Sequence, residues 1–287
     1  MLHLGEMLAE RYGIKGVLGR GGYSVVYFAY DWKKKRNCAI KETRITHDGC
    51  SYHMVQKEVE LIQRLKYPYF PSIEEVIEGR ESNYIVMEYL EGENLEMRLQ
   101  RLGPQDACQV ARWARDLCLM LGYLHRLHPP VIYCDIKPSN VMLQPGGNLR
   151  LVDFGAALLK PSVQGQDIGE RTSSYKDSLA LCMGTRGYAA PEQFRQDGIV
   201  DDRTDIYGVG VTMYRLLTGA DPVRFPCGTY GVRAWKPGLP RKLEKIVRKC
   251  TMPDPSGRYC SCQELKMDLE FFLSHRDPCH GAFWGKT

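Results

Sequence analysis

The chain has 287 residues, of which 44% are hydrophobic and 25% are charged, and this balance is typical of an ordinary globular protein. It excludes a disordered, collagen-like or coiled-coil chain. The 39 lysines and arginines exceed the 34 aspartates and glutamates by only five, and the basic residues are dispersed along the chain. This argues against a nucleic-acid-binding protein, in which basic residues gather on one face. At about 100–200 residues per domain, the length predicts two domains or lobes.

The chain contains 11 cysteines, which raises the question of its compartment. Residues 1–6 lack the basic stretch followed by an apolar one that marks a secretory signal, and no apolar run approaches the ~18 residues of a membrane helix. We therefore expect a soluble, cytoplasmic protein without a membrane segment in this chain, in which thiols stay reduced. Cys260 and Cys262 have the wrong spacing for a zinc knuckle, so structural thiols are favoured over a metal site.

The first third of the chain reads mostly as β-strands. One helix is predicted over 54–65, because Val59 and Ile62 lie at helical spacing in an apolar stripe and Pro68 follows the end of the stripe. The charged stretch 31–37 is expected to form the tip of a hairpin. The predicted strand runs are 17–27, which a glycine turn divides in two, 38–41, 73–77 and 84–87.

After Gly92 the pattern changes. A long amphipathic helix is predicted over 104–127, where apolar residues recur on one stripe. Two short strands follow, over 141–143 and 149–152, and residues 160–183 are polar and without periodicity, as in a mobile loop. From Thr204 the chain turns helical again and ends its last helix near Ser274. A strand-rich first part and a helix-rich second part predict a two-lobed α+β fold.

A glycine-rich segment lies between the first two strand runs. In Gly19-x-Gly21-x-x-Ser24-x-Val26 the glycines allow the backbone to approach phosphate oxygens and present its N–H groups. The dinucleotide-binding alternative requires a helix after the glycines, whereas a strand follows here. Lys41, on the next strand, would be half-buried and would need a counter-charge, for which Glu58 on the predicted helix is the candidate.

Two later segments supply the side chains that phosphoryl transfer requires. Such a reaction needs a carboxylate to orient the attacking hydroxyl, a second carboxylate and another oxygen ligand for Mg²⁺, and cations against the phosphate charge. Asp135, Lys137 and Asn140 lie in Tyr-Cys-Asp-Ile-Lys-Pro-Ser-Asn, and Asp153 lies in Asp-Phe-Gly. Both segments are expected to be loops beside short strands, where catalytic side chains are often placed.

In this order the motifs resemble those of a eukaryotic-type (Hanks-type) serine/threonine protein kinase. After the glycine-rich loop and the strand lysine come D-x-K-P-x-N at 135–140, D-F-G at 153–155 and A-P-E at 190–192. The resemblance covers roughly 11–274. The segment 184–193 is similar to the version common in bacterial kinases of this class.

The resemblance implies a bilobal protein-kinase-like α+β fold. An antiparallel sheet with one helix would form the N-lobe, and the C-lobe would be mainly helical. The expected boundaries are an N-terminal extension at 1–10, an N-lobe at 11–87, a hinge at 88–93, a C-lobe at 94–274 and a tail at 275–287.

The family's catalytic roles transfer to matching positions of this chain. Asp135 would be the catalytic base, Lys137 would meet the transferring phosphate, and Thr185 would bridge these two side chains. Asn140 and Asp153 would bind the metal. The lysine two residues after the catalytic aspartate matches kinases that act on serine and threonine.

The resemblance also implies a nucleotide site. Lys41 would hold the α- and β-phosphates and pair with Glu58 in the active state. The other expected nucleotide-binding residues are Leu18, Gly19, Gly21, Gly22, Val26, Ala39, Met87, Glu88, Leu90 and Asn94. The implied cofactors are ATP and Mg²⁺, or Mn²⁺ in its place. The implied partners are ATP, protein substrates and the chain itself through autophosphorylation, with no nucleic acid.

Three further matches have a structural role in the family. Asp205 resembles the buried helix aspartate that holds the catalytic loop. Arg258 and Glu192 resemble a structural ion pair.

The sequence departs from the family pattern in the catalytic loop. Tyr133 stands where the family usually has histidine, and Cys134 stands where most regulated kinases have an arginine that receives the activation-loop phosphate. A neutral thiol cannot make that contact, so we expect activity without loop phosphorylation. For Cys134 itself, a buried inert thiol and a redox-sensitive one are the alternatives. Ser24, which replaces the third glycine of the loop, is small enough to preserve nucleotide binding.

Two other functions remain open from the sequence. A pseudokinase would bind nucleotide without turnover, although every ionisable residue that the chemistry needs is present. A small-molecule phosphotransferase shares the base, asparagine and aspartate, but normally lacks the Lys137-Pro138 pair and the segment 184–192.

Overall fold

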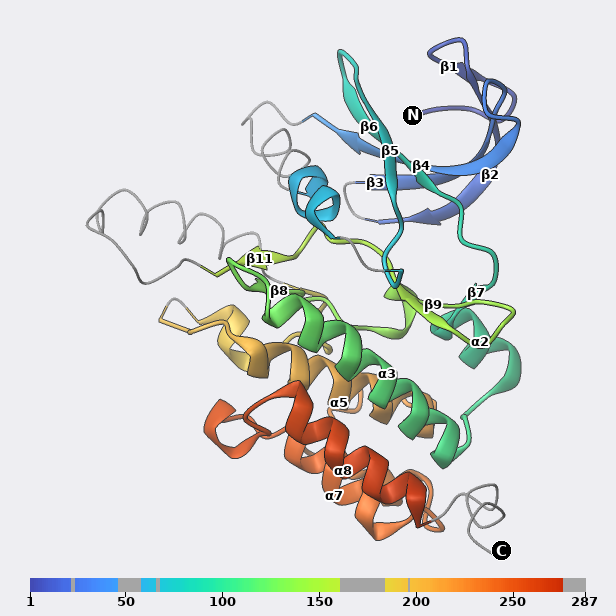
Figure 1. The fold of residues 1–287 in the computed structure, drawn as a ribbon. Helices are drawn as coiled ribbons and strands as arrows, with labels where there is room; N and C mark the ends of the chain where they lie inside the picture. The colour runs from blue at the N-terminus through green and yellow to red at the C-terminus, as the bar shows by residue number, and fades with distance from the viewer. Residues whose placement is uncertain (22–23, 46–57, 66–67, 161–183, 196, 276–287) are drawn as a thin grey trace, which may run out of the picture. The chain divides into compact units, whose positions relative to one another are not determined.

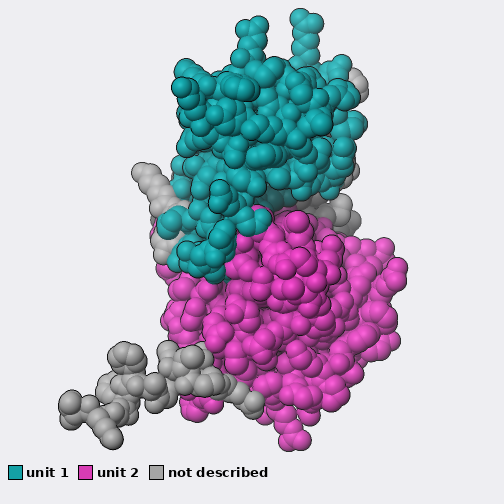
Figure 2. Space-filling model, turned by 90° about the vertical axis from the view of Figure 1, so that its right-hand side faces the viewer, with its two compact units in different colours: residues 1–92, 144–155 teal, residues 93–143, 156–287 magenta. Residues whose placement is uncertain are grey.

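A computed structural model of the chain describes residues 1–21, 24–45, 58–65, 68–160, 184–195 and 197–275. The chain divides into two compact units, which Figure 2 colours separately. Unit 1 comprises Met1–Gly92 and Gln144–Gly155, and unit 2 comprises Glu93–Leu143 and Ala156–Thr287.

Unit 1 is built on an antiparallel six-stranded sheet with the strand order β1-β2-β3-β4-β6-β5 (Figure 1). The strands are β1 (Met7–Leu8), β2 (Tyr12–Arg20), β3 (Ser24–Asp31), β4 (Arg36–Arg44), β5 (Ile73–Glu78) and β6 (Ser82–Glu88). Along β3, half-buried and buried residues alternate without exception, as expected for a strand with one face on a core. That core consists of Tyr12, Ile14, Val25, Tyr27, Ala29, Cys38, Ile40 and Val86.

The predicted strands and hairpin of unit 1 are confirmed, and β3 and β4 pair from Ser24 opposite Thr43 to Asp31 opposite Arg36. Of the helix predicted over 54–65, residues 58–64 are helical, and 54–57 lie outside the described residues. The stretch predicted as an N-terminal extension contains β1, which pairs with β2.

Unit 1 also includes a later segment, which a division by sequence order did not predict. Residues 144–155, with β10 (Leu149–Leu151), group with unit 1 rather than with the helical part of the chain. The reason is local hydrogen bonding: the Leu151 N–H donates to the Tyr69 carbonyl at 2.9 Å. The Arg150 guanidinium donates to the Phe70 carbonyl and to Glu88, both at 2.8 Å.

Unit 2 is mainly helical. Its helices are α2 (Leu95–Leu102), α3 (Ala107–His125), α5 (Asp202–Thr218), α6 (Val232–Trp235), α7 (Arg241–Cys250) and α8 (Cys262–Ser274). Helix α3 packs against α5 and α8, and α7 packs against the same two helices (Figure 1). Among the short strands, β7 (Glu93–Asn94) pairs antiparallel with β9 (Val141–Leu143), and β8 (Val131–Ile132) forms a two-stranded antiparallel sheet with β11 (Leu158–Leu159).

The helix predicted over 104–127 is α3, and it begins at Ala107 because the Asp106 carboxylate caps it by accepting the Cys108 and Gln109 N–H groups. The sequence interpretation missed α2. Its N-cap is Asn94, whose side-chain oxygen accepts the Met97 N–H at 2.8 Å. The helical signal here is only eight residues long and has two buried positions, too few for a periodicity argument.

These findings confirm the predicted α+β fold, with an antiparallel sheet in the first part and helices in the second. Within the described ranges, no helix is both long and apolar enough to cross a membrane.

Candidate active site

In unit 1, three predicted site residues form one charged cluster. Lys41 on β4 lies with its Nζ 2.7 and 2.8 Å from the two carboxylate oxygens of Glu58 and 2.7 Å from Asp153 Oδ1. The side chains of Lys41 and Glu58 are 8% and 5% exposed, whereas that of Asp153 is 46% exposed. Burial alone lowers the pKa of Lys41, but the carboxylates of Asp153 and Glu58 outweigh this and raise it. The lysine is therefore held as a cation with its ammonium in one place.

Asp153 and the two residues after it have local features that suit the position of the Asp153 carboxylate beside Lys41. Asp153 itself has a left-handed backbone (φ 67°), which aspartate tolerates better than most residues. Phe154 is buried and meets the Phe70 ring edge-to-face at 5.4 Å. A Cβ on Gly155 would lie 3.3 Å from Asp153 Oδ1 and 3.4 Å from Lys41 Nζ, so glycine leaves these two groups the most room. Phe154 thus anchors the Asp-Phe-Gly motif, and Gly155 leaves room beside Asp153 and Lys41.

The predicted nucleotide residues of unit 1 gather on neighbouring strands. Leu18 and Gly19 lie on β2, and the Gly21 N–H donates to the Ser24 carbonyl at 2.8 Å, which closes the turn into β3. Gly22 lies outside the described residues. Across the sheet, Val26 pairs with Lys41.

The strand β6 continues this set. Ala39 pairs with Met87, and Glu88 ends the strand and binds Arg150. Leu90 is buried, with 7% of its surface exposed. Asn94 belongs to unit 2, where its side-chain oxygen caps α2, so only its amide nitrogen remains for the ribose contact that the sequence predicts.

In unit 2, a second cluster centres on Asp135. Its Oδ2 accepts hydrogen bonds from Lys137 Nζ at 2.7 Å and from Asn140 Nδ2 at 3.0 Å, and its Oδ1 accepts the Thr185 N–H at 2.9 Å. Lys137 Nζ is also 2.5 Å from Thr185 Oγ1. The four side chains that the sequence singled out in this unit are therefore bonded to one another. Three hydrogen bonds fix the orientation of the carboxylate, which is 11% exposed.

Lys137 and Thr185 are bonded although they are 48 positions apart in sequence. Two features of the backbone hold the loop that carries Lys137 in place. Pro138–Asn140 form a 3₁₀ turn with proline at its first position, which directs Asn140 back to Asp135. Beneath the loop, α5 comes very close: a Cβ on Gly208 would lie 2.9 Å from the Ile136 Cβ. Only glycine allows this approach, so the helix supports the catalytic loop directly.

Asn140 in unit 2 and Asp153 in unit 1 each carry an oxygen of the kind that a hard divalent cation binds. Asn140 gives both of its recorded bonds through Nδ2, to the Asp135 carbonyl and carboxylate, so its amide oxygen is the remaining donor atom. Asp153 offers a half-exposed carboxylate. Amide and carboxylate oxygens are the ligands that Mg²⁺ prefers, and it usually takes few of them from protein when phosphate is present. Consistent with this, the described residues contain no cluster of three or more His, Cys, Asp or Glu placed to hold a metal alone.

Asp205 on α5 holds the backbone that precedes Asp135. Its two carboxylate oxygens accept the Tyr133 N–H at 2.9 Å and the Cys134 N–H at 2.8 Å, and the residue is 1% exposed. Cys134 has a left-handed backbone (φ 67°), a conformation that costs a non-glycine residue about 1–3 kcal/mol. The two charge-assisted bonds offset that cost and orient the next residue, Asp135.

The Cys134 side chain is buried with Ile132, Leu158 and Val200 in a small apolar cluster. Its Sγ lies 3.6 Å from the Ile132 carbonyl, and the residue is 5% exposed. This environment favours the structural alternative for this thiol over the redox-sensitive one. All eight cysteines within the described residues are free thiols.

Sequence reasoning missed His125 and Cys262, which complete the support of the loop. His125, at the end of α3, lies with Nε2 2.7 Å from Asp205 Oδ2 and with Nδ1 3.8 Å from Cys262 Sγ on α8. Burial alone lowers the pKa of His125, but its bonds to Asp205 and Cys262 raise it to about 11, so the ring is a cation. A histidine on an apolar stripe was the available signal, but nothing in the local sequence indicates its partners.

The expected structural ion pair is also present. Arg258 binds both Glu192 oxygens, at 2.7 and 2.9 Å, and their side chains are 0% and 6% exposed. Next to it, Gln193 Nε2 donates to the Cys134 carbonyl at 3.0 Å, a contact that the sequence did not indicate. The Ala-Pro-Glu segment is thereby tied to the catalytic loop.

Residues 12–269 match the family model described as "Protein kinase domain". Among curated proteins, the chain is similar to the serine/threonine-protein kinase PrkC of Bacillus subtilis, with 28% identity over 93% of this chain and 41% of the relative. It is also similar to PknB of Mycobacterium tuberculosis, with 29% identity over 91% of this chain and 43% of the relative. The chain thus spans about two fifths of the length of these relatives. This chain belongs to the protein kinase family, and the relatives named here are bacterial serine/threonine-protein kinases.

Proposed function

We propose that this chain is an ATP- and Mg²⁺-dependent protein serine/threonine kinase. The observation that carries the proposal is the bonded set of Asp135, Lys137, Asn140 and Thr185 in unit 2. A carboxylate oriented by three donors, next to a lysine and a threonine, is what the transfer of a phosphoryl group to a hydroxyl requires.

In the proposed step, the hydroxyl oxygen of a substrate serine or threonine forms a bond to the γ-phosphorus of ATP. The bond between that phosphorus and the β,γ-bridging oxygen breaks, and ADP leaves with the electron pair. Asp135 orients the hydroxyl and accepts its proton, and the Lys137 ammonium offsets charge on the transferring group. Thr185 keeps these two side chains in register through its N–H and its hydroxyl.

For the nucleotide, Lys41 is the proposed cation for the α- and β-phosphates. Its ammonium already lies between Glu58 and Asp153, as this role requires. Gly19, Gly21 and Gly22 are proposed to cover the phosphates. The proposed adenine and ribose contacts are Leu18, Val26, Ala39, Met87, Glu88, Leu90 and Asn94.

Asn140 and Asp153 are the proposed metal ligands, because they carry oxygen donors of the right kind. When bound, Mg²⁺, or Mn²⁺ in its place, would supply positive charge against the phosphate oxygens.

The proposed partners are protein substrates and, through autophosphorylation, the chain itself. A cytoplasmic location is proposed because the free thiols in the described part of the chain need a reducing compartment to persist. The activation segment 160–183 lies, apart from its first residue, outside the described residues. The independence from its phosphorylation, inferred from Cys134, therefore remains a prediction.

The test is a transfer assay with the purified chain, γ-labelled ATP, Mg²⁺ and a generic basic protein substrate. Label should appear on phosphoserine and phosphothreonine, and the Asp135→Asn variant should lose it by at least about 100-fold, which also controls for contaminating kinases. The chain would be a pseudokinase if it binds nucleotide but transfers no label in the presence of Mg²⁺ or of Mn²⁺. Transfer to small alcohols but not to protein would indicate a small-molecule phosphotransferase.

A further inference from the structure

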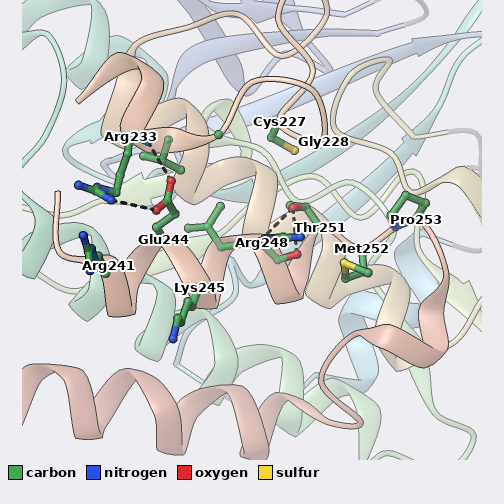
Figure 3. Close-up of a pocket in the computed structure, with 13 residues that line it drawn as sticks. Cys227, Gly228, Arg233, Arg241, Glu244, Lys245, Arg248, Thr251, Met252 and Pro253 are labelled. Atoms are coloured by element: carbon green, nitrogen blue, oxygen red, sulfur yellow. Dashed lines mark hydrogen bonds and ion pairs between the residues drawn. The ribbon is translucent and has the colours of Figure 1, made fainter. Parts of the chain in front are cut away.

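One cavity in the helical unit lies outside the proposed catalytic residues and has a basic wall. It has a volume of about 560 Å³ and lies between the segment that leads into α6 and the helix α7 (Figure 3). Four cationic side chains line it: Arg233, Arg241, Lys245 and Arg248. The single acidic residue in the lining is Glu244. Its carboxylate is already engaged by Arg233, through the backbone N–H at 3.3 Å and the guanidinium at 3.9 Å.

Helix α7 carries five cations, and the structure uses them unequally. Lys242 lies 3.1 Å from the centre of the Phe271 ring on α8. Lys249 forms an ion pair at 2.8 Å with Glu264, which is also on α8. The other three, Arg241, Lys245 and Arg248, are exposed, and no ion pair to them is recorded among the described residues. The helix therefore has one face whose charges stabilise the fold and one face whose charges do not.

The three uncommitted cations form a row along α7. Positions 241, 245 and 248 lie on one face of a helix, and the rise of 1.5 Å per residue separates the first from the second by about 6 Å and from the third by about 10 Å. In an extended peptide, side chains two residues apart point to the same side and are separated by about 7 Å. The steps of the row, about 6 Å and about 4.5 Å, are shorter than this spacing. Lysine and arginine side chains are long and flexible, so they can still reach anionic residues at alternate positions of an extended segment.

We propose that this cavity is a docking site for an acidic segment of a protein, with carboxylate or phosphate groups at alternate positions along an extended strand. The volume suits several residues, because ligand pockets commonly measure about 300–1,000 Å³. Of the apolar residues in the lining, Met252 is 37% exposed and would contact the residues between the anions, whereas Val232 and Val247 are each only 2% exposed. A nucleic acid or a lipid surface fits less well, because the lining is concave and short and the excess charge of the whole chain is only +5.

The site goes beyond the proposed kinase activity, because binding requires no ATP and no phosphoryl transfer. The test is fluorescence anisotropy with the full chain, without ATP, and a labelled twelve-residue peptide that carries glutamate at alternate positions. A peptide with glutamine at those positions is the matched control, and a third peptide carries phosphoserine there. The glutamate or phosphoserine peptide should bind, more weakly as salt is raised. The tighter of these two identifies the anion.

The decisive variant is Lys245→Glu/Arg248→Glu, and its control is Lys33→Glu/Lys35→Glu in the exposed turn between β3 and β4. Both variants change the formal charge from +5 to +1, because each of two substitutions removes two charges. Reversal of two exposed ion pairs should weaken peptide binding by about tenfold or more in the first variant and leave the second within about twofold.

Three results would overturn the proposal: equal weakening in both variants, equal binding of the glutamine peptide, or binding of duplex DNA or phosphatidylserine vesicles but of no peptide. Matched melting temperatures and ATP affinities for the two variants show that the fold is intact. A chain that fails the kinase assay but binds the acidic peptide would refute only the proposed activity.

Discussion

Asp205 should support catalysis through the loop that it holds, without contact to either substrate. The substitution Asp205→Asn keeps the size and shape of the side chain but replaces one carboxylate oxygen by an amide nitrogen. That nitrogen cannot accept a hydrogen bond, so one of the Tyr133 and Cys134 N–H groups loses its partner. The substitution also removes the negative charge that lies 2.7 Å from His125.

The expected cost follows from these contacts. An unsatisfied buried N–H costs about 1–3 kcal/mol, and the removal of one partner of a buried ion pair costs about 3–5 kcal/mol in total. The side chains of His125 and Asp205 are 5% and 0% exposed, so water cannot replace the lost contacts. With about 2 °C per kcal/mol for a chain of this size, the melting temperature should fall by about 6 °C or more.

The assay combines thermal denaturation with steady-state kinetics below the melting temperature of the variant. We expect kcat to fall by about tenfold or more, because the backbone before Asp135 can relax from its left-handed conformation. The KM for ATP should stay within about twofold, because Lys41 and Glu58 belong to unit 1. Asp116→Asn is the matched control: its partly exposed pair with Arg115 is worth about 0–1 kcal/mol.

The reasoning would be refuted if Asp205→Asn melts within about 2 °C of the unaltered chain, since this is the smallest shift that one lost hydrogen bond should produce. It would also be refuted if the KM for ATP rises while kcat is unchanged. That pattern would place the effect at the nucleotide and not at the loop.

Three other predictions concern separate ion pairs. Lys41→Met removes the cation beside Glu58 and should lower kcat/KM by about 100-fold or more with an unchanged circular dichroism spectrum; a variant with a tenth of the activity or more would contradict the phosphate role. Arg258→Met leaves the buried carboxylate of Glu192 without its cation, with only the Thr204 hydroxyl as a donor among the described residues, and should cost about 3–5 kcal/mol in urea denaturation. A loss below about 1 kcal/mol would show that this pair adds little. Because the pKa of His125 is raised from 6.5 to about 11, its contribution to stability is complete below pH 6.5 and is lost as the pH rises toward 11. The melting temperature of His125→Gln should therefore fall less steeply than that of the unaltered chain between pH 7 and 10, and parallel curves would disprove the linkage.

Much of the fold was predictable because its signals are local. The alternation of β3 and the long apolar stripe of α3 depend on neighbouring residues, and the structure confirms both elements. The short helix α2 was missed because eight residues carry too little periodicity, and its capping residue Asn94 was assigned to the ribose.

In the candidate site, too, some features were predictable from local sequence and others were not. The residue types and spacing of 135–140 and 153–155 were sufficient to indicate phosphoryl transfer, because the chemistry needs those groups within short segments. The grouping of the Asp153 segment with unit 1 does not follow from sequence order: this segment makes hydrogen bonds to residues 69, 70 and 88.

The sequence by itself determined the family, the α+β composition and the residues from which the chemistry is inferred, because these depend on local pattern and on the order of motifs. Only the tertiary structure decided which cations are paired, what holds the catalytic loop and where a cavity with uncommitted charge remains. Asp205 lies 80 residues from His125, and Cys262 lies 137 residues from it. Such partners are chosen by the packing of whole helices, and no property of either residue's neighbours specifies them.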